Sequence, residues 1–130
     1  MLFTRQFGSD LDDKVTDTAV GGGRFVVAGI TEGSFAGTSS GLSDAFVRVF
    51  TTSGDVQYSR QMGSAGNESG SRVLIGTDNS VYLAANSSGA IGVQRGGEDV
   101  VIRAYDGSGG QLFTRQIGSI ENEILNGFSF

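Results

Sequence analysis

The chain has 130 residues and a formal net charge of −5, and it contains 22 Gly but no Pro, Cys, His or Trp. An acidic chain with a single lysine, Lys14, lacks the clustered positive charge that nucleic acids and anionic membrane surfaces require, so neither is expected as a partner. No apolar stretch approaches the roughly 18 residues of a membrane span, and no basic start followed by an apolar run marks a signal peptide.

One five-residue phrase, Arg-Gln-x-Gly-Ser, occurs three times, beginning at Arg5, Arg60 and Arg115. The spacing is 55 residues in both intervals (60 − 5 and 115 − 60). Self-similarity at a fixed period of this size is typical of repeat architectures. We expect this register to hold without a gap, so that residues 2–56 align with 57–111, Val26 aligns with Val81, and residues 112–130 begin a third copy.

Each complete copy contains four strand-like runs. In the first copy they are Val15–Val20, Arg24–Thr31, Asp44–Phe50 and Val56–Met62. In the second copy they are Arg72–Ile75, Ser80–Ala85, Asp99–Tyr105 and Gln111–Ile117. A long Gly- and Ser-rich loop follows the second run of each copy, and a short Gly-containing turn follows the third. The third run alternates its two faces residue by residue, which is the period of a strand and not of a helix.

Four antiparallel strands per unit, repeated every 40 to about 55 residues, predict an all-β fold made of β-propeller blades. The predicted organisation is a lone N-terminal strand at 2–8, one blade at 15–62, a second blade at 70–117, and the first strand of a next blade at 124–130. Two blades cannot close a ring of about four to eight, so we expect an incomplete ring in one chain. Because Met1 leads directly into the repeated phrase, the chain is expected to begin inside a structural unit.

The two outermost blades of such a segment would each leave one apolar face uncovered, which indicates that another protein surface covers it. An exposed apolar patch of roughly 400 Å² per face, at about 25 cal/mol per Å², forfeits about 10 kcal/mol. This is comparable with the total stability of a small domain, about 5–15 kcal/mol. We therefore expect the chain to be part of a longer propeller, or to form a homo-oligomeric ring of three or four chains joined head to tail, with residues 124–130 exchanged as a swapped strand.

Several motifs of the chain resemble the bacterial β-propeller repeat called SBBP. In the first copy these motifs are Phe3–Ser9, Arg24–Thr31 and Gly41–Phe50 with Ser53 and Gly54. In the second copy they are Tyr58–Ser64, Thr77–Leu83 and Gly96–Tyr105. The resemblance covers essentially the whole chain. It implies propeller architecture and an extracellular or bacterial cell-surface setting, but no single activity, because propellers host many functions.

Charged residues recur at equivalent positions of the copies: Arg5, Arg60 and Arg115; Arg48 and Arg103; Asp44 and Asp99; Asp13, Glu68 and Glu123. A group that every unit needs is expected to hold the units together, so we predict structural ion pairs. The alternative is a ligand site, since Arg binds carboxylates well.

One dense acidic cluster, Asp10, Asp12 and Asp13, lies just before the first long strand. Calcium needs about six to eight oxygen ligands, and the corresponding loops of the other copies are less acidic, so a solvated turn is expected and metal binding is the alternative. Gly21-Gly22-Gly23 lacks the following helix and Lys of a phosphate loop and is predicted to be a hairpin turn.

The absence of His and Cys excludes Ser-His-Asp and Cys-His catalysis and His/Cys zinc sites. We therefore predict no enzyme activity, no catalytic residue, no cofactor and no metal site. The leading hypothesis is a structural or interaction module that assembles with copies of itself or with the rest of a longer propeller. The alternative is a propeller that binds a glycan or calcium through the long loops, Glu32–Ser43 and Asn86–Glu98, or through the Asp10–Asp13 turn.

Overall fold

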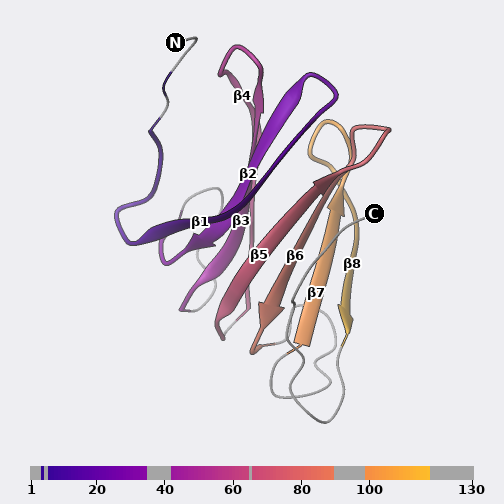
Figure 1. The fold of residues 1–130 in the computed structure, drawn as a ribbon. Coiled ribbons are helices and arrows are strands. Elements are labelled where there is room, and N and C mark those ends of the chain that lie inside the picture. The colour runs from indigo at the N-terminus through magenta and orange to yellow at the C-terminus, as the bar shows by residue number, and fades with distance from the viewer. Residues whose placement is uncertain (1–3, 5, 35–41, 65, 90–98, 118–130) are drawn as a thin grey trace.

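The computed structural model describes residues 4, 6–34, 42–64, 66–89 and 99–117, and these residues form two four-stranded antiparallel sheets (Figure 1). The first sheet has the order β1 (Asp13–Gly21), β2 (Arg24–Thr31), β3 (Asp44–Thr51) and β4 (Val56–Met62). The second has the order β5 (Glu68–Ile75), β6 (Val81–Ser87), β7 (Asp99–Tyr105) and β8 (Gln111–Ile117). The described residues contain no helix. The prediction of an all-β fold is thus confirmed.

The strand bounds follow the sequence pattern closely. β2, β4, β7 and β8 begin and end where the alternation predicts. β1 and β5 begin earlier than predicted, at Asp13 and Glu68. The reason is one acidic residue at the start of each strand, which lies opposite a hydroxyl residue: Asp13 pairs with Thr31, and Glu68 pairs with Ser87.

The expectation of a gapless 55-residue register is wrong in one place. Thr31 pairs with Asp44 in the first sheet, and Ser87 pairs with Asp99 in the second. The third strands, β3 and β7, are therefore 55 residues apart in sequence (99 − 44). The second strands, β2 and β6, are 56 residues apart (87 − 31). The structural equivalent of Val81 is therefore Phe25 and not Val26. The extra residue lies in the turn between β5 and β6, and the following loop is one residue shorter.

The predicted hairpin turn at Gly21-Gly22-Gly23 is confirmed. Gly22 and Gly23 have φ angles of 58° and 73°, in the left-handed region where a glycine carries no steric cost. The longer turn between β5 and β6 places Asn79 at φ 65°, and Asn is one of the few other residues that tolerate this conformation. Both turns reverse the chain between the first two strands of a sheet.

The two sheets pack face to face around one apolar core, which we call the inner joint. The first sheet contributes one face, the inner face, made of Val26, Ala28, Ala45, Val47, Val49, Tyr58 and Met62. The second sheet contributes Val73, Val81, Leu83, Ala85, Val101 and Tyr105. Polar contacts add to the joint: Thr16 donates to the Ser71 carbonyl (2.6 Å), and the backbone N–H of Val73 donates to Asp17 (2.9 Å).

The opposite face of the first sheet carries a second, smaller apolar cluster of Val27, Phe46 and Phe50, with Phe25 and Phe7 packed against it. Phe25 stacks on Phe50 at 4.8 Å between ring centroids, and Phe7 lies 5.6 Å from Phe50. Phe7 belongs to the segment before β1, where a lone strand at 2–8 was predicted. Residues 4 and 6–8 form no strand in the structure and instead bring Phe7 onto the sheet face.

Some predictions lie outside the described residues. These are the roles of Arg5 and Glu123, the strand at 124–130, and most of both long loops. Among the residues that are described, no helix has the length and apolar character to cross a membrane.

Candidate functional site

The most strongly organised polar group of the molecule lies where β4 leads into β5. Glu68 is 1 % exposed, and its carboxylate accepts hydrogen bonds from the Ser64 hydroxyl (2.6 Å), the Ser64 N–H (3.2 Å) and the Ser87 hydroxyl (2.7 Å). Burial raises the pKa of Glu68 against the opposing effect of these hydrogen bonds, and the nearby Asp44 carboxylate adds to the rise. We call Ser64, Glu68 and Ser87 the inner cluster.

The same arrangement recurs before β1, and we call Ser9, Asp13 and Thr31 the outer cluster. The Asp13 carboxylate accepts from the Ser9 N–H (2.6 Å), the Ser9 hydroxyl (3.0 Å) and the Thr31 hydroxyl. Burial is the largest single effect on the Asp13 carboxyl and raises its pKa, but the hydrogen bonds from Thr31 and Ser9 together outweigh it, so the pKa is lowered. The predicted ion pairs of Asp13 and Glu68 are therefore replaced by hydrogen bonds to hydroxyl and amide groups.

Arg60 crosses the inner joint from β4. Its Nε donates to the Gly109 carbonyl in the turn between β7 and β8 (2.8 Å), and its guanidinium lies 5.1 Å from the centre of the Tyr58 ring. Gly109 has φ 92°, and a Cβ there would come within 2.7 Å of both Arg60 and Tyr58. Burial raises the pKa of Tyr58 to about 12, so its hydroxyl stays neutral in the joint. Arg60 thus holds a turn and not a carboxylate.

Arg24 also crosses the joint, and the repeat pattern did not single it out. Its side chain is 5 % exposed and donates to the carbonyls of Gly107 (2.9 Å) and Asn79 in the two turns at one end of the second sheet. The structural equivalent of Arg24 is Ser80, so no recurrence marked it. Its unusual place as a charged residue opening an apolar strand is the one signal that could have found it.

Arg48 and Arg103 lie within their own sheets and donate through Nε to Ser59 and Thr114, both at 2.7 Å. Asp44 and Asp99 are buried and accept from Gln61 (2.8 Å) and Gln116 (3.0 Å), the Gln residues of the repeated phrase. Each of these Gln side chains also donates to a glycine carbonyl at the start of a long loop, Gly33 or Gly89. The phrase therefore anchors the fourth strand to the third strand and to the loop.

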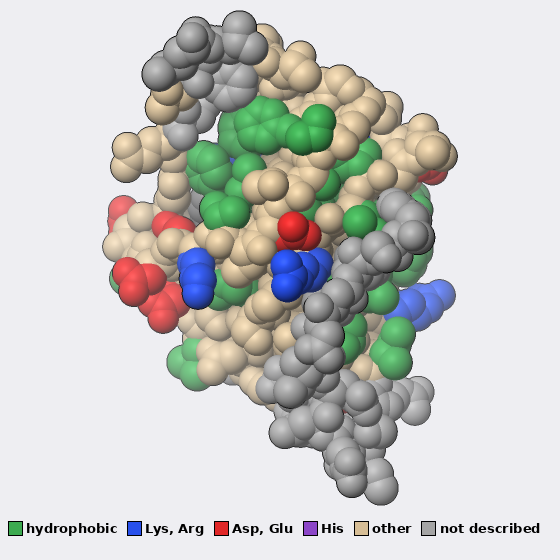
Figure 2. Space-filling view, in the orientation of Figure 1, with side chains coloured by type: hydrophobic (Ala, Val, Ile, Leu, Met, Phe, Trp, Pro, Cys, Tyr) green, Lys and Arg blue, Asp and Glu red, His purple; other side chains and the backbone are tan. Residues whose placement is uncertain are grey.

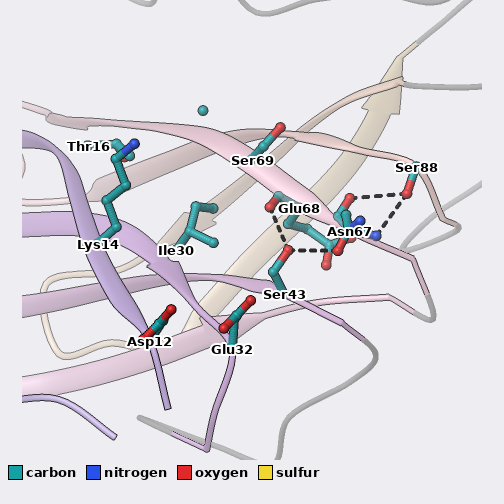
Figure 3. Close-up of a pocket in the computed structure, with 11 residues that line it drawn as sticks. Asp12, Lys14, Thr16, Ile30, Glu32, Ser43, Asn67, Glu68, Ser69 and Ser88 are labelled. Carbon is teal, nitrogen blue, oxygen red and sulfur yellow. Dashed lines mark hydrogen bonds between the residues drawn. The ribbon is translucent and has the colours of Figure 1, made fainter.

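A groove of about 660 Å³ runs between the two sheets beside the inner cluster (Figure 3). Figure 3 shows Asp12 and Glu32 at one end of the groove and Asn67 and Ser88 at the other. Ser43 lies beside Glu32 and donates a hydrogen bond to Asn67 at 3.0 Å. The remaining lining residues are Lys14, Thr16, Ile30, Glu68, Ser69 and Gly70. Hydroxyl, amide and carboxylate groups of this kind can hydrogen-bond a polyol. The first long loop begins and ends at the groove, at Glu32 and Ser43, and Ser88 near the start of the second also lines it.

The acidic cluster divides in the structure. Asp13 turns toward Ser9, Asp12 lines the groove, and Asp10 lines a separate shallow hollow with Glu32 and Ser34. Within the described part of the chain, no three acidic side chains lie close enough together to hold a metal ion. The structure thus does not bring the three aspartates together.

The outer faces of the two sheets expose apolar side chains whose equivalents are buried in the inner joint. On the second sheet, Phe113 is 37 % exposed and Ile117 is 55 % exposed, whereas the equivalent Tyr58 and Met62 of the first sheet are 7 % and 1 % exposed. On the first sheet, Val20 is 82 % exposed, whereas its equivalent Ile75 packs against the core of the joint. Figure 2 shows hydrophobic side chains reaching the surface among polar ones.

Comparison with known proteins gives no match: no family model fits the chain, and no curated protein is similar to it in sequence.

Proposed function

We propose that the two sheets are consecutive blades of a β-propeller of the SBBP type, and that the chain is a non-enzymatic structural module that assembles with a second copy of itself. The exposed apolar residues Phe113 and Ile117 on the second sheet and Val20 on the first support this proposal, because the repeat equivalent of each packs in the inner joint. The setting outside the cytoplasm that the resemblance implies is part of the same proposal.

The two outer faces are complementary to each other. The inner joint brings the inner face of the first sheet against the opposite face of the second sheet. The outer face of the second sheet (Tyr82, Val100, Ile102, Phe113 and Ile117) is the repeat equivalent of that inner face. The outer face of the first sheet (Val20, Phe25, Phe46 and Phe50) is the repeat equivalent of the face through which the second sheet packs in the inner joint. A second copy can therefore stack head to tail and repeat the joint, and such heterologous contacts form a ring when the rotation between copies closes.

The mass of the chain in solution tests this proposal. Light scattering over a wide concentration range is expected to give a trimer or a tetramer, since three or four copies supply six or eight sheets, within the roughly four to eight blades of propellers. Val20→Asp and Ile102→Asp, one on each outer face, are expected to dissociate the assembly. Thr52→Asp adds the same charge in an exposed turn and should leave it intact. A cooperatively folding monomer at every concentration would contradict the proposal.

The groove beside the inner cluster supports a second candidate function, binding of a glycan or of calcium. Its paired Asp12 and Glu32 and its Ser and Asn side chains offer oxygen and amide groups to a polyol or a hard cation. A glycan array and a calcium titration followed by calorimetry test this function. No binding in both experiments would remove it, and binding that survives Asp12→Asn with Glu32→Gln would move the site elsewhere.

A further inference from the structure

The first residues of the chain repeat the last strand of the second sheet. Residues 2–6 have the sequence Leu-Phe-Thr-Arg-Gln, and residues 112–116 have the same five residues in the same order. The equivalent stretch of β4, residues 57–61, is Gln-Tyr-Ser-Arg-Gln and shares only the last two. Over residues 2–9 and 112–119 the single difference is Phe7 in place of Ile117.

The identical residues are the ones through which β7 binds β8. Arg103 of β7 donates to the Thr114 hydroxyl at 2.7 Å, and the Gln116 side chain donates to Asp99 at 3.0 Å and to the Gly89 carbonyl at 2.9 Å. Thr4 and Gln6 carry the same groups at the same spacing. An extended segment with residues 2–7 would therefore offer β7 the same Thr and Gln side-chain hydrogen bonds that β8 offers.

The outer cluster holds the N-terminal segment, residues 6–9, in the same position relative to β1 that the end of β4 has relative to β5. Ser64 joins the end of β4 to Glu68 of β5, and Ser9 joins the N-terminal segment to Asp13 of β1 through the same set of hydrogen bonds. Met62 packs into the inner joint, and its equivalent Phe7 packs on Phe50 at 5.6 Å. Residues 6–9 thus lie where the last strand of a preceding sheet would end.

This placement creates a conflict when a second copy docks on the outer face of the first sheet. The docking copy brings its β8 to the position that the N-terminal segment of the first copy already holds, and only one of the two can occupy it. The N-terminal segment is already held at that position by the hydrogen bonds of Ser9 to Asp13 and by the packing of Phe7 on Phe50, so an incoming β8 would have to displace it.

We propose that the N-terminal strand of one copy, residues 2–7, replaces β8 on β7 of the neighbouring copy, so that the joint between copies is a swapped strand. This inference rests on the proposed function, because it describes how the joint between copies is made. The neighbour then supplies β5, β6 and β7, and the exchanged strand continues through Gly8 and Ser9 into β1, as β4 continues into β5. Exchange of an identical element is a low-cost route to assembly.

A disulfide between two chains tests the exchange, since the natural chain contains no Cys. Thr114 pairs with Arg103, so in the exchanged joint Thr4 lies opposite Arg103 of the neighbour. Directly opposed residues of antiparallel strands have Cα atoms about 4.5–5.5 Å apart, within the range that a disulfide spans. A T4C chain mixed with an R103C chain and oxidised gently is expected to give a linked pair of twice the 13.5 kDa chain mass as its main product.

Two controls and a second pair make the test decisive. T52C in place of T4C measures random collision from an exposed turn, and R103C/T114C in one chain should lock β8 in place and abolish the linked pair. F7C with V100C probes the same exchange at another position, because Val100 pairs with Ile117. A ring seen by light scattering with no linking above the T52C level in either pair would overturn the exchange and leave the proposed function standing. A monomer in light scattering would overturn the proposed function instead.

Discussion

The inner and outer clusters have the same hydrogen bonds but different surroundings. Glu68 is buried between two sheets and has a raised pKa, whereas Asp13 lies at the surface and has a lowered pKa. The cluster geometry therefore comes from each sheet and the residues that precede it, because Ser, acid and hydroxyl residues recur at the same positions. The burial comes from the neighbouring sheet. An outer cluster that a second copy covers should come to resemble the inner one.

The largest expected difference between the two regions concerns Met62 and Ile117. Met62→Ala is expected to lower the unfolding free energy by about 2–5 kcal/mol, because it leaves a cavity in the inner joint. Ile117→Ala should change it by no more than about 0.5 kcal/mol in a chain kept monomeric by dilution, since a side chain that is 55 % exposed has few contacts to lose. Urea unfolding measures both values. Equal losses in the two variants would mean that the outer face is packed as well.

Gly109 tests the turn that Arg60 and Tyr58 enclose. Gly109→Ala is expected to cost about 1–2 kcal/mol for a left-handed backbone and about 1–3 kcal/mol more for the contacts of the added Cβ with Arg60 and Tyr58. The matched control is Gly23→Ala, which has φ 73° and no atom within 4 Å of the added Cβ, so it should show the backbone cost alone. Thermal unfolding followed by circular dichroism compares the two. Indistinguishable melting temperatures would rule out the steric contribution.

Arg60 and Arg115 are equivalent residues of the two sheets, but only Arg60 contacts a turn of the other described sheet. Arg60→Ala should cost about 1.5–3 kcal/mol, the value of a hydrogen bond to a charged donor, because it loses the Gly109 carbonyl and the Tyr58 ring. Arg115 is exposed and lies 5.5 Å from the Phe113 ring, and its replacement by Ala should change the stability of the monomer by about 0.5 kcal/mol or less. A comparable loss at Arg115 in dilute solution would contradict this difference.

The smallest expected effects are in the pH dependence of stability. The folded pKa of Glu68 is raised, so the folded chain binds more protons than the unfolded chain, and this group adds stability as pH falls through the raised pKa. The folded pKa of Asp13 is lowered, so its contribution is present above the unfolded pKa and is lost as pH falls through the folded value.

Glu68→Gln and Asp13→Asn separate the two contributions. The difference in unfolding free energy between the natural chain and E68Q should grow in favour of the natural chain toward acid pH, and the difference from D13N should shrink. Urea titrations between about pH 7 and about pH 3, which span the ordinary carboxyl range, measure both. Slopes of the same sign for both variants would contradict the opposite environments of the two carboxylates.

The sequence by itself determined the strands, the turns and their grouping into two units. Residue-by-residue alternation in β3 and β7 and the glycines between β1 and β2 are local signals, because strand periodicity and positive φ depend on neighbouring residues alone. The recurrence of the Arg-Gln-x-Gly-Ser phrase fixed where each unit ends, and it also marked Asp13 and Glu68 as related residues.

Only the tertiary structure decided which residues meet. The extra residue in the turn before β6 shifts that strand by one position, which exchanges the side chains on its two faces. Val81 and Val26 both lie in the inner joint, but on opposite faces of their two sheets. A sequence alignment of the two copies does not show this difference. The contacts of Thr31 with Asp13 and of Ser87 with Glu68, and the carbonyl partners of Arg24, likewise depend on contacts between separate strands and turns. Such contacts join residues far apart in the chain, and their geometry depends on how two sheets pack, which no local pattern records.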